Sequence, residues 1–165
     1  MTKIKKILAP TDLSELSKAG VRYAFEAASA QDAETIVYNV IPYEETSILG
    51  TRVEWVDAHR DLPGLRPMLE ERQRILLRFL RENFAPLLTR LRIRPDVDLG
   101  APDKRILEKA AEEGVDIIVM STHGRTGLSH MLLGSVTERV VRHAPCPVLS
   151  IRPEHKEAQR VTAAA

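Results

Sequence analysis

The chain of 165 residues is 44% apolar and 28% charged, and its 24 basic and 23 acidic side chains almost cancel. This composition predicts one compact globular domain and excludes a strong net field that would attract nucleic acid or anionic lipid. The single cysteine, Cys146, excludes an internal disulfide, and no apolar run reaches membrane-spanning length. We therefore expect a cytoplasmic protein with no membrane partner.

Short apolar runs alternate with segments of helical periodicity along most of the chain. Pro86 lies inside the longest helical segment and predicts a kink near Asn83. The polar connection at residues 42–64 has no readable periodicity, and we expect a lid or a partner-facing segment there. In chain order, the expected elements are a strand at 4–9, a helix at 14–30, a strand at 35–40, a helix at 66–91, a strand at 93–99, a helix at 101–113, a strand at 116–121, a helix at 134–143 and a strand at 147–151.

Strands that alternate with helices imply parallel pairing through right-handed crossovers. The expected fold is therefore a doubly wound α/β sandwich with helices on both faces of the sheet. In the first helix, the spacing of Leu16, Ala19, Tyr23 and Ala27 predicts the side that faces the sheet.

The segment after the fourth expected strand is the most informative part of the chain. From Ser121 to Ser135 it reads Ser-Thr-His-Gly-Arg-Thr-Gly-Leu-Ser-His-Met-Leu-Leu-Gly-Ser and then opens onto a helix. A glycine-containing loop at a helix start presents backbone N–H groups to an anion, and the helix dipole favours negative charge there. If the first and fourth strands are neighbours, this loop meets residues 9–14 and 40–43 at one crevice beyond the carboxyl ends of the strands. The sequence thus predicts a phosphate-binding site and favours a bound nucleotide.

Several of these residues also have simpler structural interpretations. Ser135 caps a helix whether or not a ligand is bound, and Asp12 is suited to capping the first helix or forming an Asx-turn. His123 and His130 lack a further ligand at metal-binding spacing, so we interpret them as solvated loop residues. Cys146 is interpreted as a small, half-buried thiol without a redox role.

Several motifs together resemble the universal stress protein family. Gly124, nine intervening residues and then Gly134-Ser135 are similar to the signature Gly-x2-Gly-x9-Gly-Ser/Thr of the ATP-binding branch of that family. One position departs from this signature, because Ser121 stands where the family has its first glycine. The other matching motifs are Ala-Pro-Thr-Asp at 9–12, Gly-Ala-Pro at 100–102, Asp-Ile-Ile-Val-Met at 116–120 and Ala-Pro-Cys-Pro-Val at 144–148.

The resemblance implies a Rossmann-like, HUP-type sheet of five parallel strands in the order 3-2-1-4-5. It implies one family domain at residues 1–153, followed by a flexible tail at 154–165. Bound ATP, ADP or AMP would contact Asp12 and the Val40 backbone through adenosine, and Mg²⁺ or Mn²⁺ would be held through the phosphates without a protein ligand. The residues that the resemblance assigns to the nucleotide site are Ala9, Pro10, Thr11, Asp12, Val40, Met120, Ser121, Gly124, Arg125, Gly134, Ser135, Val136 and Thr137.

The function implied by the resemblance is that of a nucleotide-dependent stress-response switch or sensor. No nucleophile elbow, Walker loop or zinc-protease motif occurs, so we expect no dedicated catalytic activity. Two alternatives remain open: an interaction module of the same fold that uses no nucleotide, and a weak ATPase.

The resemblance also implies a homodimer through the strand at 147–151 and an unidentified protein partner. Arg74, Arg78 and Arg81 are interpreted as a solvated helix face and not as a nucleic-acid surface.

Overall fold

The computed structural model describes residues 3–43, 65–122 and 134–153, and every structural statement below concerns these residues. Nine elements alternate between strand and helix, as the sequence predicts. Their bounds are β1 Lys6–Pro10, α1 Lys18–Gln31, β2 Glu34–Ile41, α2 Leu65–Leu88, β3 Arg92–Leu99, α3 Pro102–Glu113, β4 Ile117–Ser121, α4 Ser135–His143 and β5 Val148–Ile151.

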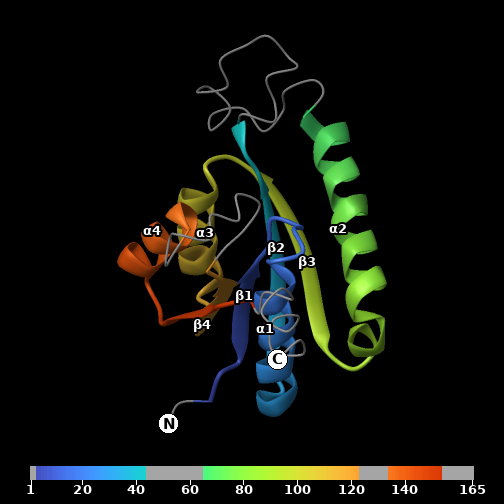
Figure 1. Cartoon of the computed structure of the whole chain (residues 1–165), viewed down its shortest axis with the longest axis vertical. Coiled ribbons are helices and arrows are strands. Elements are labelled where there is room, and N and C mark those ends of the chain that lie inside the picture. Colours follow the sequence, from blue (N-terminus) through green and yellow to red (C-terminus); the bar gives the residue numbers. More distant parts are fainter. Residues whose placement is uncertain (1–2, 44–64, 123–133, 154–165) are drawn as a thin grey trace, which may run out of the picture.

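The strands form one parallel sheet in the order β3-β2-β1-β4-β5. β1 is the central strand. Strands β2 and β3 follow on one side of it, and β4 and β5 on the other, so the direction in which strands are added reverses between β1 and β4. Helices α1 and α2 cover one face of the sheet, and α3 and α4 cover the other (Figure 1). The doubly wound sandwich and the strand order are thereby confirmed. Within the described ranges, no helix is both long enough and apolar enough to span a bilayer.

The central strands are apolar on both faces because a helical layer covers each side of the sheet. Along β1, Leu8 packs into the cluster beneath α3 and α4, whereas its neighbours Ile7 and Ala9 pack beneath α1. This alternation follows from the two-residue period of a strand. All three side chains are fully buried, so β1 forms a rigid base for the segment that follows it.

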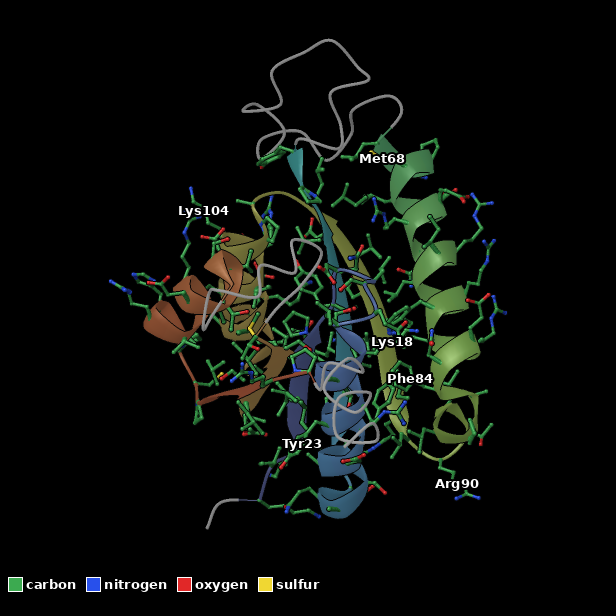
Figure 2. All side chains as sticks on the ribbon, viewed as in Figure 1. Lys18, Tyr23, Met68, Phe84, Arg90 and Lys104 are labelled. Atoms are coloured by element: carbon green, nitrogen blue, oxygen red, sulfur yellow. The ribbon has the colours of Figure 1, made fainter. Side chains whose placement is uncertain are left out.

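Helix α1 begins later and faces the sheet differently from the prediction. Its buried side is made by Gly20, Val21, Ala24, Phe25 and Ala28. Tyr23, which was expected to face the sheet, is 44% exposed (Figure 2). The prediction was wrong because alanines lie on two sides of this helix. Two faces, offset from each other by one residue along the sequence, are therefore both apolar, and the periodicity does not distinguish them. The fit of Gly20 and Phe25 against other elements selects between them.

Helix α2 is interrupted where the sequence predicts it. Phe84 has a non-helical φ of −137° and ψ of 16°, two residues before Pro86, which provides no backbone N–H. The ring of Phe84 packs edge-on against Phe25 of α1 at 5.3 Å and against Phe79 at 5.9 Å between centroids (Figure 2). The kink therefore places an aromatic side chain in the core between the two helices.

A carboxylate joins β1 and β4 at their amino ends, opposite the edge at which ligands bind in this fold. Asp116 accepts the backbone N–H groups of Lys5 and Lys6 at 2.7 and 2.9 Å. These backbone bonds, that of Lys5 foremost, lower the pKa of Asp116. Its contribution to stability is thus present above the ordinary pKa of an aspartate and is lost as the pH falls through the lowered value.

Candidate functional site

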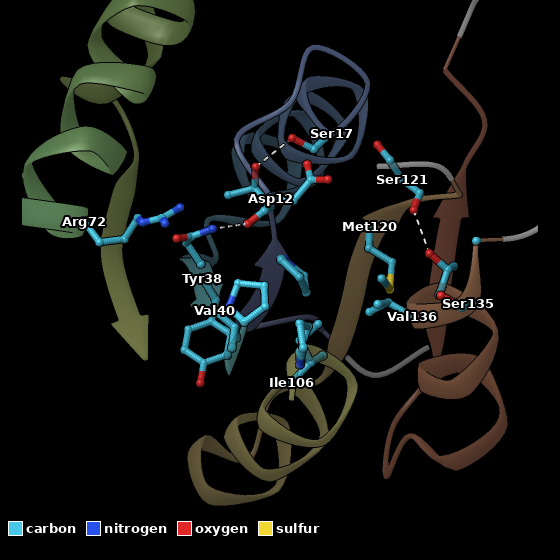
Figure 3. Close-up of a pocket in the computed structure, with 17 residues that line it drawn as sticks. Asp12, Ser17, Tyr38, Val40, Arg72, Ile106, Met120, Ser121, Ser135 and Val136 are labelled. Carbon is cyan, nitrogen blue, oxygen red and sulfur yellow. Dashed lines mark hydrogen bonds between the residues drawn. The ribbon is translucent and has the colours of Figure 1, made fainter. Parts of the chain in front are cut away.

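A pocket of about 300 Å³ opens at the carboxyl ends of β1, β2 and β4, beside the reversal of strand order (Figure 3). Segments far apart in the sequence converge there, because parallel strands all end at the same edge of the sheet. The lining residues are Pro10, Thr11, Asp12, Ser17, Tyr38, Asn39, Val40, Pro42, Arg72, Pro102, Ile106, Met120, Ser121, Gly134, Ser135, Val136 and Thr137.

Most of the residues that the sequence assigned to a nucleotide site line this pocket. Ala9 does not: it is fully buried below the pocket and packs with Ala24 and Val119. Gly124 and Arg125 lie outside the described residues, as do residues 44–64 of the expected lid or partner-facing segment. The assigned residues that do line the pocket are Pro10, Thr11, Asp12, Val40, Met120, Ser121, Gly134, Ser135, Val136 and Thr137.

Sequence reasoning missed the contributions of α2, α3 and the middle of β2. Arg72 is a cationic side chain from α2, and Figure 3 shows it reaching toward the pocket from the side opposite Ser135. Pro102 and Ile106 come from the start of α3. Pro102 belongs to the Gly-Ala-Pro motif, which the sequence analysis did not assign to the site. No local motif marks Arg72 or Ile106, because their place in the pocket depends on how whole helices pack against the sheet. Pro42 lies in the segment 40–43 that was expected at the crevice, and the lining residues missed are Ser17, Tyr38, Asn39, Arg72, Pro102 and Ile106.

The turn between β1 and α1 forms one wall of the pocket and is held by its own polar groups. Oδ1 of Asp12 accepts the backbone N–H of Ser14 at 3.1 Å and its hydroxyl at 2.6 Å, so the Asx-turn interpretation is correct. The Thr11 and Ser17 hydroxyls lie 2.8 Å apart, and Nδ2 of Asn39 donates to the Thr11 carbonyl at 2.8 Å (Figure 3). This network fixes the place of the Asp12 carboxylate.

The start of α4 forms the opposite wall. The N–H of Gly134 donates to the Thr122 carbonyl at 2.7 Å, so this amide is already engaged within the chain. The chain approaches closely here, because a Cβ at Gly134 would lie only 3.0 Å from that same oxygen. The next N–H groups, of Ser135, Val136 and Thr137, lie in the first turn of the helix, which provides them with no intrahelical acceptor.

These three amides are suited to hold an anion. No side chain caps α4, and within the described residues no hydrogen bond satisfies them. The Thr137 hydroxyl donates to the Ser121 carbonyl at 3.0 Å and so fixes this turn to the end of β4 (Figure 3). Ser135 itself is exposed, which leaves its hydroxyl accessible beside the amides. The helix dipole adds to the preference for negative charge.

The rest of the pocket is mainly apolar. Pro10, Val40, Ile106, Met120 and Val136 provide its apolar surface. Burial, and after it the neighbouring Asp98 carboxylate, raises the pKa of Tyr38, so this phenol stays protonated at neutral pH. In the part of the chain that is described, no three His, Cys, Asp or Glu side chains gather as they would around a metal ion. The arrangement suits a ligand with a flat apolar part and an anionic end.

Cys146 is half-buried and lies just before β5. Its side chain packs at the margin of the core cluster that contains Ile118. Desolvation raises the pKa of this thiol, so it stays protonated at neutral pH. The interpretation of Cys146 as a structural thiol agrees with this environment.

The fold defines a Rossmann-like α/β domain with a pocket at the switch point of its sheet. Comparison with known proteins identifies the family: residues 3–152 match the model of the universal stress protein family. The chain belongs to this family.

Similar proteins span nearly the whole chain. Universal stress protein MJ0531 of Methanocaldococcus jannaschii is 33% identical over 153 residues, which cover 93% of this chain and 85% of that protein. The solved structure of MJ0577, from the same organism, has a TM-score of 0.73 at 28% identity and covers 94% of this chain and 100% of its own. A universal stress protein solved in complex with cAMP shares the fold, with a TM-score of 0.61 at 22% identity over 93% of this chain and 100% of its own.

Proposed function

We propose that this protein binds ATP, or ADP or AMP, in the pocket and acts as a nucleotide-dependent stress-response switch or sensor. The observation that carries the proposal is the first turn of α4, where the amides of Ser135, Val136 and Thr137 have no partner among the described residues. A polyphosphate satisfies several such donors at once and also interacts favourably with the helix dipole. Gly124 and Arg125 are part of the same proposal, although they lie outside the described residues.

The remainder of the pocket supports an adenosine group. Val40, Ile106 and Met120 provide an apolar surface for a base, and Asp12 places a carboxylate acceptor where ribose hydroxyls would donate. A protein of the same fold has been solved with cAMP, which is an adenine nucleotide. We include Mg²⁺ or Mn²⁺ in the proposal as an ion held through phosphate oxygens.

Calorimetric titration of the purified protein with ATP in the presence of Mg²⁺ tests this function directly. We expect saturable binding of one ATP per chain, and we expect heat-denatured protein to release an adenine nucleotide carried through purification. Mass spectrometry of the released material distinguishes ATP from ADP and AMP. If neither binding nor release occurs at millimolar ATP, the protein is instead an interaction module of this fold that uses no nucleotide.

A homodimer through β5 is a further part of the proposal. β5 is an edge strand, and its four side chains, Val148 to Ile151, are only half-buried in the single chain. An apolar edge with unpaired backbone groups is a surface on which a second copy can add its own strand. We expect light scattering to give twice the mass of one chain, and we expect Leu149→Lys to give a monomer. A wild-type protein that stays monomeric at all concentrations would contradict this part.

A further inference from the structure

The position at which this chain departs from the family signature connects both walls of the pocket. The Ser121 hydroxyl accepts the N–H of Gly20 at 3.0 Å and donates to the carbonyl of Leu16 at 2.9 Å. The backbone carbonyl of the same residue accepts the hydroxyl of Thr137 at 3.0 Å. One residue at the end of β4 thus holds the start of α1 through its side chain and the start of α4 through its backbone.

The bond to Gly20 replaces a local helix cap. Gly20 is the third residue of α1, and its N–H lies in the first turn, where the helix offers no acceptor. Ser17 is at the N-cap position, but its side chain makes no capping bond and instead donates to the Ser14 carbonyl at 2.8 Å. The acceptor that α1 lacks locally is supplied by Ser121, from a strand about a hundred residues later in the chain.

Gly20 and Ser121 are sterically matched. A Cβ at Gly20 would lie 2.6 Å from the backbone nitrogen of Ser121 and 2.8 Å from the carbonyl carbon of Met120. Only a glycine allows α1 to approach β4 this closely, and only at this distance does the serine hydroxyl reach the helix amide. Ser121 is 7% exposed, so both of its side-chain hydrogen bonds are shielded from water.

We propose that Ser121 is a positioning residue for the nucleotide: its hydroxyl fixes the β1–α1 turn, and with it Asp12, at the correct distance from the amides of α4. This inference rests on the proposed function and adds to it the residue that sets the spacing of the two walls. The turn is held to β2 at Thr11 by Asn39, and to β4 at Leu16 and Gly20 by Ser121, so removal of the hydroxyl loosens the side of the turn that faces β4. A ligand that contacts both walls at once depends on this spacing, whereas one that contacts only α4 does not.

The test compares Ser121→Ala with Asp116→Ala, a control that weakens the opposite edge of the sheet. Binding is measured at a temperature well below the unfolding midpoint of each variant, so that a loss of stability alone leaves the affinity unchanged. For Ser121→Ala, we expect ATP affinity to fall about tenfold, as for the loss of shielded hydrogen bonds, with inorganic triphosphate affinity unchanged. For Asp116→Ala, we expect both affinities to match the wild type. Ser121→Gly, which carries the residue of the family signature, serves as a second variant if the alanine protein does not fold.

Amide hydrogen exchange in the ligand-free protein tests the contact without any nucleotide. We expect the Gly20 amide to exchange faster in Ser121→Ala than in the wild type, while Asp116→Ala leaves it protected. Faster exchange together with wild-type ATP affinity would overturn the positioning role, and unchanged exchange would overturn the capping bond itself. A wild-type protein that binds no ATP would instead refute the proposed function, and the exchange at Gly20 would still decide whether Ser121 caps α1.

Discussion

Replacement of Ser135 by aspartate should abolish most ATP binding and leave the fold intact. Ser135 is exposed in the first turn of α4, beside the amides that the proposal assigns to phosphate. A carboxylate there repels the phosphates and competes for the same N–H groups. At the N-terminus of a helix, however, the same carboxylate interacts favourably with the dipole, by about 0.3–1 kcal/mol. Affinity and stability therefore move in opposite directions.

We expect Ser135→Asp to raise the ATP dissociation constant by roughly a hundredfold, which corresponds to about 2.7 kcal/mol. Its thermal midpoint should equal or exceed that of the wild type. Ser135→Asn is the matched control, because it has nearly the same shape without the charge, and it should retain most of the affinity. Calorimetric titration and thermal unfolding measure the two quantities. Wild-type affinity in the aspartate variant would mean that α4 does not hold the phosphates.

Replacement of Gly20 by alanine should destabilise the protein strongly, contrary to helix propensity. In an exposed helix interior, glycine to alanine stabilises by roughly 0.5–1 kcal/mol. At Gly20, the added Cβ would meet backbone atoms of Met120 and Ser121 at 2.6 to 3.0 Å. Backbone atoms of a central strand cannot rotate away, so α1 must move off the sheet. We expect a loss of about 3 kcal/mol and a midpoint lower by roughly 10 °C.

Urea unfolding of Gly20→Ala alongside Gly114→Ala separates steric overlap from backbone conformation. Gly114 ends α3 with a left-handed φ of 57°, and a Cβ there would have no heavy atom within 4 Å. Its replacement should cost only about 1 kcal/mol, the price of the left-handed conformation alone. A Gly20→Ala protein as stable as the wild type would show that α1 and β4 do not pack as closely as described.

Local chemistry was sufficient to predict the architecture of this protein. Apolar runs of strand length, helical periodicity between them and the glycine and proline residues at their ends specify each element from its own residues. The kink before Pro86 was predictable for the same reason, because a missing N–H acts within one turn of a helix. The segments that meet at the carboxyl edge of the sheet followed from parallel pairing, once the first and fourth strands were taken as neighbours.

Only the tertiary structure decided which face each helix buries and which polar groups are already engaged. The sequence favoured Tyr23 for the buried face of α1, and it gave no sign that the Gly134 amide is bound to Thr122 or that Arg72 lines the pocket. The bond between Gly20 and Ser121 joins residues 101 positions apart. Such contacts depend on the distance between packed layers, which many side chains set together. A local sequence pattern predicts whether a segment is a helix or a strand, but it does not predict which other elements that segment packs against.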